Sequence, residues 1–202
     1  TVIDSELTIA ADCSHYMVHD DVYISKTGRL NIMPGVEIWM AEGANLFVEG
    51  SLNAFGTEDS LISIRIHPDL DGKSWGGIVF QNTPEASSLT YVSIEDASSG
   101  PDHRHSNAAI SAFNADLEMD NLVIEDVFSN PVISKYSNLR ISNSKFHSKV
   151  TGDLVNAKYG SAEIVTCEFN GNAQPDTDGV DYDEIINGVI SNCTFSGFYG
   201  PN

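Results

Sequence analysis

The segment Ala162-Glu-Ile-Val-Thr-Cys-Glu-Phe169 decides the fold, because the chain repeats its pattern. Mostly apolar residues occupy the first, third, sixth and eighth positions of each copy. The same spacing recurs in Leu117-Glu-Met-Asp-Asn-Leu-Val-Ile124, Leu139-Arg-Ile-Ser-Asn-Ser-Lys-Phe146 and Gly188-Val-Ile-Ser-Asn-Cys-Thr-Phe195. A partial earlier copy ends at Ile94, so the last apolar position recurs in steps of 30, 22, 23 and 26 residues. Such a period indicates a solenoid.

Each copy has the spacing of two short strands separated by a bend, because alternate residues of a strand face the same side. A third short strand precedes each copy, as in Ala109-Ile-Ser111 and Leu154-Val-Asn156. The N-terminal half follows the same plan with Gly and Pro-Gly turns. Strands are expected to begin near 22/30/36, 46/52/62, 78/89/92, 110/117/122, 132/139/144, 155/162/167 and 181/188/193. The sequence therefore predicts an all-β fold, a parallel β-helix of about seven rungs with three short strands per rung.

The repeat extends through nearly the whole chain, so we expect one β-helix domain over residues 1–202. Residues 1–20 are expected to form an N-terminal cap or lead-in segment, and residues 97–107 a loop insertion. This loop carries His103-Arg104-His105, which is interpreted either as a solvated loop tip or as a functional element. The abrupt start at Thr1 suggests a mature protein or a domain excised from a larger secreted protein.

Aligned copies predict ladders of equivalent side chains, because neighbouring rungs lie about 4.8 Å apart. The fifth position is a turn position at which amide side chains can form hydrogen bonds along the stack. It holds Asn121, Asn143, Thr166 and Asn192. Cys167 and Cys193 occupy the next position and are expected to pack inward as stacked thiols, with a disulfide between them left open.

These rungs, the turn ladder and the phrases Pro34-Gly-Val36 and Trp75-Gly-Gly-Ile78 resemble the right-handed parallel β-helix superfamily over about residues 20 to 200. The superfamily includes pectate lyases, polygalacturonases and non-catalytic modules. The resemblance implies a right-handed coil. In size and pattern the chain is also similar to β-helical modules that bind xylan-type plant polysaccharides. Function must still come from the site, because this fold hosts many activities.

The charge balance excludes several partners. Ten Lys and Arg residues stand against 29 Asp and Glu residues, which gives a net charge of −19. A nucleic-acid-binding protein needs clustered cations, and an anionic membrane surface repels such a chain. We therefore expect neither nucleic-acid binding nor membrane insertion.

The segment Pro175–Glu184 contains five carboxylates around Gly179. Oxygen ligands around a glycine turn suit Ca²⁺, which accepts irregular geometry. A solvated acidic turn is the alternative interpretation. The candidate metal ligands are Asp176, Asp178, Asp181, Asp183 and Glu184.

The same segment, Asp176-Thr-Asp-Gly-Val-Asp181, resembles the Asn-Thr-Asp-Gly-x-Asp signature of polygalacturonase-like glycosidases. The resemblance implies that Asp178 and Asp181 would be the catalytic residues if the protein were an enzyme. In that family, an Asp pair one rung later completes the acid and base group. The following rung here is Gly197-Phe-Tyr-Gly-Pro-Asn202, which lacks the pair, and the family's His-Gly and Arg-x-Lys motifs have no counterpart.

Several aromatic and charged residues are candidates for binding a sugar. Strand alternation places Glu37 and Trp39 on the outside, where a Trp ring can stack on a sugar unless a loop or another domain covers it. Lys135 aligns with Lys158, and Tyr136 with Tyr159, which predicts either a ladder for an acidic sugar or two interior tyrosines with extended lysines. Tyr182 is a further candidate near the C-terminal end.

Three functions are consistent with these residues. The preferred hypothesis is a non-catalytic carbohydrate-binding module of a secreted, bacterial extracellular, polysaccharide-degrading enzyme. Its partners would be a xylan-type polysaccharide and a neighbouring catalytic domain in the same chain, with Ca²⁺ as a candidate cofactor. The alternatives are a polysaccharide lyase or glycoside hydrolase, and a cell-surface adhesin or structural stalk.

Overall fold

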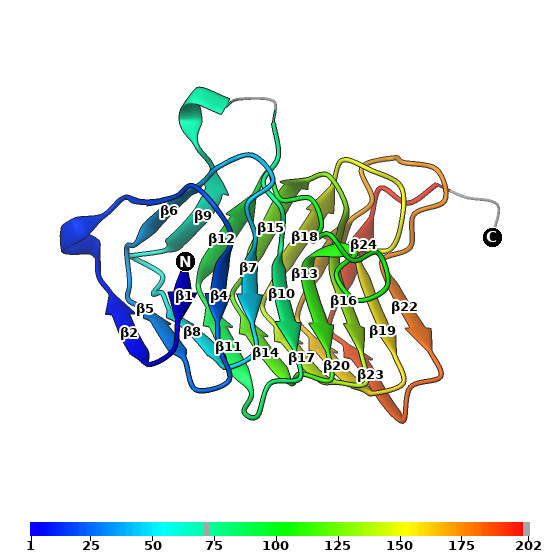
Figure 1. The fold of residues 1–202 in the computed structure, drawn as a ribbon. Coiled ribbons are helices and arrows are strands. Elements are labelled where there is room, and N and C mark those ends of the chain that lie inside the picture. The colour runs from blue at the N-terminus through cyan, green and yellow to red at the C-terminus, as the bar shows by residue number, and fades with distance from the viewer. Residues whose placement is uncertain (71–72, 200–202) are drawn as a thin grey trace.

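The computed structural model describes residues 1–70 and 73–199 and shows a right-handed parallel β-helix (Figure 1). The chain winds through eight rungs, and each rung adds one strand to each of three parallel sheets. Two short 3-10 helices interrupt the coil, η1 (Ala11–Cys13) and η2 (Pro68–Leu70). Within the described ranges, neither of these helices has the length and apolar character needed to cross a membrane.

The three sheets are named A, B and C here. Sheet A contains β1 (Val2–Ile3), β4 (Val22–Ile24), β7 (Leu46–Val48), β10 (Ile78–Gln81), β13 (Ala108–Phe113), β16 (Asn130–Lys135), β19 (Val155–Lys158) and β22 (Val180–Asp183). Sheet B contains β2 (Glu6–Ile9), β5 (Arg29–Ile32), β8 (Ser51–Phe55), β11 (Ser87–Thr90), β14 (Leu117–Asp120), β17 (Asn138–Ser142), β20 (Ser161–Val165) and β23 (Asn187–Ser191). Sheet C contains β3 (Tyr16–Val18), β6 (Glu37–Met40), β9 (Ile62–Ile66), β12 (Val92–Glu95), β15 (Val123–Val127), β18 (Lys145–Ser148), β21 (Glu168–Asn170) and β24 (Thr194–Ser196).

The strand register confirms the sequence repeat. The last apolar position of each copy forms one continuous inward column in sheet C, from Ile94 through Ile124, Phe146 and Phe169 to Phe195. The three phenylalanine rings of this column stack with centroids 5.1 and 4.9 Å apart. Equivalent residues are therefore direct neighbours along the coil axis.

The prediction of seven rungs is one rung short. β1, β2 and β3 form the first rung from the segment that was expected to be a cap or lead-in, and they pair in parallel with β4, β5 and β6. The alternation in this rung is hidden because β1 is only two residues long and η1 separates β2 from β3. Residues 2–18 therefore belong to the coil itself.

The corners of the coil depend on residues with positive φ, a conformation that Asn and Asp adopt more easily than other side chains. One corner row, between sheets B and C, contains Tyr91, Asn121, Asn143, Thr166 and Asn192. This row includes the whole predicted turn ladder. The amides of Asn121 and Asn143 both donate to the carboxylate of Asp120, at 2.8 Å, so the hydrogen bonds along this row use a carboxylate acceptor.

The inward-facing cysteines are both free thiols. Cys167 is buried, and the backbone N–H of Cys167 donates to Sγ of Cys193 over 3.4 Å. Burial raises the pKa of the Cys167 thiol to about 11. The two cysteines stack inward as expected, without a disulfide between them.

Candidate functional site

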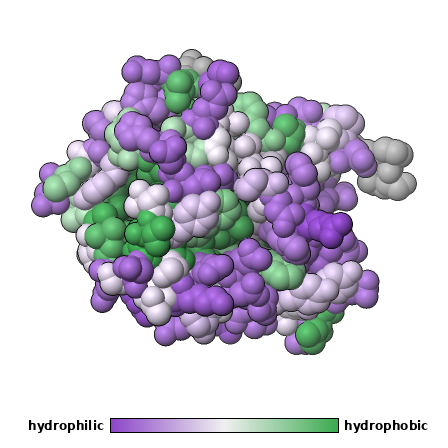
Figure 2. All heavy atoms as spheres, viewed as in Figure 1, coloured by the Kyte–Doolittle hydropathy of each residue, from purple (hydrophilic) through white to green (hydrophobic). Residues whose placement is uncertain are grey.

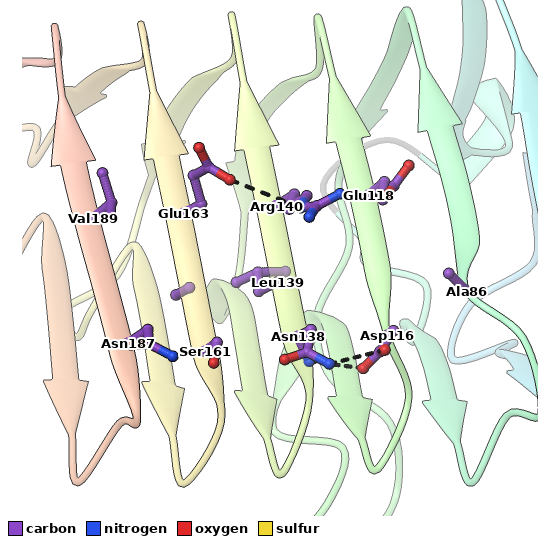
Figure 3. Close-up of a pocket in the computed structure, with 11 residues that line it drawn as sticks. Ala86, Asp116, Glu118, Asn138, Leu139, Arg140, Ser161, Glu163, Asn187 and Val189 are labelled. Atoms are coloured by element: carbon purple, nitrogen blue, oxygen red, sulfur yellow. Dashed lines mark hydrogen bonds and ion pairs between the residues drawn. The ribbon is translucent and has the colours of Figure 1, made fainter.

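A polar groove of about 420 Å³ crosses the outer face of sheet B (Figure 3). It extends over β14, β17, β20 and β23, whose outward side chains form rows along the coil axis. One row contains Asp116, Asn138, Ser161 and Asn187. The second row contains Glu118, Arg140, Glu163 and Val189.

Ion pairs and hydrogen bonds between adjacent rungs hold these side chains. Arg140 lies between two carboxylates, with Nη1 3.2 Å from Glu118 and Nε 3.7 Å from Glu163. Asp116 accepts two hydrogen bonds from Asn138, at 2.8 Å from the backbone N–H and 3.0 Å from the amide. All these groups are exposed, so the pairs contribute little to stability, and their main effect is to order a surface rich in donors and acceptors.

An exposed aromatic pair lies at the corner beside this groove. Tyr136 is 54% exposed and Tyr159 is 39% exposed, and their rings stack with centroids 4.9 Å apart and 19° between their planes. Both residues have positive φ, 55° and 58°, which turns the side chains outward at the corner between sheets A and B. Asn138, two residues after Tyr136, already lines the groove. The alternative of two interior tyrosines is therefore wrong.

The two lysines of the predicted ladder have partners on the protein. Lys135 donates to the carbonyl oxygen of Arg104 at 2.8 Å, and Lys158 forms an ion pair with Asp183. The hydrogen bond with Asp183 is the main cause of a raised pKa of Lys158. Lys135 thus ties the loop insertion of residues 97–107 to sheet A through a neutral acceptor, whereas the charge of Lys158 is paired with a carboxylate.

Trp39 and Glu37 face outward from β6, as predicted. The ring of His15 stacks on Trp39 with centroids 3.3 Å apart, and His67 meets it edge-on at 5.3 Å. The indole N–H is enclosed and has no acceptor among the described residues. The chain itself covers one face of Trp39, and this ring is only half-buried whereas Tyr136 and Tyr159 are exposed, so the tyrosine pair is the more accessible aromatic surface.

The carboxylates of the acidic turn, residues 176–184, contact different groups. Asp181 accepts a hydrogen bond from Asn156 at 2.7 Å, Asp183 pairs with Lys158, and Asp176, Asp178 and Glu184 are exposed. Over residues 1–70 and 73–199, no three His, Cys, Asp or Glu side chains are grouped to hold a metal ion. The structure thus places the five predicted calcium ligands in one region without bringing three together.

Tyr182 points into the coil. It is half-buried, packs against the core, and donates from its hydroxyl to the carbonyl oxygen of Val189 at 3.3 Å. Burial raises the pKa of Tyr182 to about 12. The structure therefore places this residue away from the outer surface on which a polysaccharide would lie.

Asp153 is a residue that sequence reasoning missed. The buried amide of Asn156 donates both to Asp153, at 2.9 Å, and to Asp181, at 2.7 Å. Burial raises the pKa of both carboxyls, and for Asp153 the charges of Asp181 and Asp178 raise it further. Asp153 lies in a connection between rungs, outside every repeat position, so the alignment of copies carried no signal for it.

The raised pKa of Asp153 predicts how the stability of the fold depends on pH. A carboxyl with a raised native pKa stabilises the fold at low pH, and this contribution is lost as the pH rises through the native value. Asp153→Asn keeps an acceptor for Asn156 and removes the charge, so we expect a higher unfolding temperature at pH 7 and a smaller difference between about pH 4 and pH 7.

Thermal unfolding followed by circular dichroism at both pH values measures this effect. Asp59→Asn, at an exposed position, is the control for net charge. Equal gains at pH 7 from the two substitutions would contradict a specific role of Asp153.

Comparisons with protein-family models, with curated proteins and with solved structures found no match to this chain.

Proposed function

We propose that this protein is a non-catalytic carbohydrate-binding module, and that a neutral polysaccharide of the xylan type lies along sheet B. The observation that carries the proposal is the exposed, stacked pair Tyr136 and Tyr159 beside the polar groove. Aromatic rings offer an apolar face to the C–H groups of a sugar, while carboxylates and amides bond its hydroxyl groups. Tyr136 and Tyr159 each precede by two residues a polar residue that lines the groove, Asn138 and Ser161.

The length and direction of the groove also favour a polymer. A second hollow on sheet B shares Glu118 and Arg140 with the groove and extends the polar face to Ser88, Thr90 and Ser142. The rows run along the coil axis with a spacing of about 4.8 Å per rung. An extended chain can therefore meet equivalent polar groups on successive rungs, as a linear polysaccharide requires.

A different aromatic pair lies on sheet A and has other surroundings. Tyr23 and Phe47 stack with centroids 4.8 Å apart in a groove of about 260 Å³ that is also lined by Val79 and Gln81. Figure 2 shows a hydrophobic patch over β1, β4 and β7. Ser25, Glu49 and Gln81 are the polar partners beside this aromatic pair, fewer than the seven polar residues that line the groove on sheet B, so we place the polysaccharide on sheet B.

Affinity electrophoresis through gels that contain xylan or other neutral polysaccharides tests the proposal. The native protein is expected to be retarded and to release no reducing sugar. Tyr136→Ala and Tyr159→Ala are each expected to weaken retardation about two- to tenfold, because aromatic packing contributes about 0.5–1.5 kcal/mol.

Tyr23→Ala is the matched control, since Tyr23 is an exposed and stacked tyrosine on another face. Lack of retardation on every glycan would contradict the function, and a loss confined to Tyr23→Ala would move the site to sheet A. Repeating the gels with Ca²⁺ and with a chelator tests whether the acidic turn contributes a calcium ion.

A second candidate, glycoside hydrolysis, is favoured by the Asp153–Asp181 pair. Hydrolysis of a glycosidic bond needs one protonated and one ionised carboxyl, and the raised pKa of Asp153 suits the acid, while both carboxyls accept from the same amide of Asn156. This pair differs from Asp178 and Asp181, the pair that the resemblance implied, and shares Asp181 with it. New reducing ends that disappear in Asp153→Asn and in Asp181→Asn would favour this candidate over binding alone.

A further inference from the structure

Two cationic residues meet beside the exposed tyrosine pair, and neither has a carboxylate partner. Lys135 ends β16 and directly precedes Tyr136. Its Nζ donates to the backbone carbonyl oxygen of Arg104 at 2.8 Å. Among the described residues, the side chains of Lys135 and Arg104 form no ion pair. A carbonyl oxygen takes one of the three donors of an ammonium group and leaves its charge uncompensated.

This pairing pattern differs from that of most other cations in the chain. The chain has 29 acidic and 10 basic residues. Carboxylates pair with Arg29, Lys73, Arg140, Lys145, Lys149 and Lys158. In the outward row of sheet A, Lys135 lies in register between Phe113 and Lys158. Neither register neighbour of Lys135 is therefore a carboxylate, on a surface that is otherwise rich in them.

The loop insertion is packed against the aromatic pair and holds the second cation there. Nδ1 of His105 lies 2.8 Å from the carboxylate of Asp102, and the His105 ring meets Phe113 with centroids 4.2 Å apart. Phe113 in turn meets Tyr136 edge-on at 5.7 Å. These ring contacts, together with the bond from the lysine, fix Arg104 beside the proposed sugar-binding surface.

The carboxylates of this corner have other partners. Asp102 accepts from the backbone N–H of Arg104 at 2.9 Å and also contacts the imidazole of the loop. These two hydrogen bonds lower the pKa of Asp102. Asp183 forms an ion pair with Lys158. The charge of Lys135 is therefore available to an anion on a bound molecule.

A neutral polymer with isolated carboxylates fits this arrangement. A polyanion would be repelled by the net charge of −19, whereas a single carboxylate can approach a local cation. We propose that the polysaccharide carries sparse uronate side groups, and that Lys135 and Arg104 bind one of them while Tyr136 contacts the main chain. The inference rests on the proposed function, because the tyrosine pair determines where the main chain lies.

Two polymers separate this inference from the proposed function. One is a xylan that carries glucuronate side groups, and the other is the same xylan after its carboxyl groups have been reduced to alcohols. In affinity electrophoresis, the native protein is expected to bind the first polymer about two- to fivefold more tightly, the effect of one exposed ion pair. Tyr136→Ala is expected to weaken binding to both polymers by the same factor, because it removes a contact with the main chain.

Substitutions of the two cations test their role. Lys135→Gln and Arg104→Gln are each expected to reduce the preference for the first polymer, and the double variant is expected to abolish it. Lys135→Arg should keep the preference, because it keeps the charge. Arg104→Gln retains the carbonyl oxygen that the lysine binds, so it changes charge without removing the bond that holds the loop.

The matched control is Lys26→Gln. Lys26 is exposed, forms no ion pair among the described residues, and follows β4, four strands away from β16 in sheet A. Circular dichroism checks that every variant is folded. Equal binding of the native protein to both polymers, a preference that persists in the double variant, or an equal loss in Lys26→Gln would overturn the inference and leave the proposed function standing. No retardation on either polymer would refute the proposed function and this inference with it.

Discussion

Phe169→Ala is expected to lower the free energy of unfolding by about 3–5 kcal/mol, the range for removing a large aromatic side chain from a packed core. Phe169 is only 1% exposed and lies between the rings of Phe146 and Phe195 in the inward column of sheet C. Both neighbouring rings are nearly parallel to it, at 9° and 10°. Alanine would leave a cavity that these rings cannot fill without leaving their own rungs.

Urea unfolding followed by circular dichroism gives the free energy of unfolding. Phe195→Ala is the matched control, because Phe195 occupies the same column one rung later and is 46% exposed. Its loss is expected to be about half as large, since less apolar surface is buried. Equal losses for the two substitutions would show that burial in the column does not set the stability.

The repeat predicted the fold because a solenoid turns sequence spacing into spatial contact. The final apolar positions from Ile94 to Phe195 were aligned by counting residues, and they are paired in register in sheet C. The first rung escaped because β1 has two residues and η1 interrupts the alternation before β3. The alternation of apolar and polar residues was informative wherever a strand was long enough to show it.

The charged row of the groove on sheet B is visible in the repeat of the sequence. Glu118, Arg140 and Glu163 occupy the second position of three successive copies, so the alignment already placed opposite charges side by side. The outward turn of Tyr136 and Tyr159 depends instead on a positive φ at a corner, which residue type does not indicate for tyrosine. Contacts between unlike segments, such as His15 on Trp39 or Asp153 on Asn156, also lie outside any repeat.

The three sheets share an apolar interior, but their outer faces differ from one another in chemistry. All three inner faces are apolar, whereas the outer faces carry polar rows on sheet B and an apolar patch over the first rungs of sheet A. The stacked backbone fixes the spacing of every row. Distinct binding surfaces on one coil can therefore be tested independently by substituting outward residues.

Asn45→Ala is expected to cost about 2–4 kcal/mol, because one buried amide bonds groups from three successive rungs. Asn45 is 6% exposed and donates to Asp21 at 3.0 Å and to the carbonyl oxygen of Gly43 at 2.9 Å. Its amide oxygen accepts from the N–H of Gly77 at 3.0 Å. Alanine would leave these groups without the partner that the side chain supplies, at a corner where Gly76 has no side chain to fill the space.

Asn45→Asp keeps the shape of the side chain and changes its hydrogen bonds, so this variant tests the hydrogen bonds alone. One carboxylate oxygen can still accept from Gly77, but the other would face the carboxylate of Asp21 in place of an N–H donor. We therefore expect this variant to lose more stability at about pH 7 than at about pH 4, where protonation relieves the repulsion of like charges. Urea unfolding at the two pH values measures the difference.

Asn53→Ala, which removes an outward amide that donates to Asn31 at 3.3 Å, should change stability by about 0.5 kcal/mol or less. A loss for Asn45→Ala no larger than this control would refute the bridging role of Asn45.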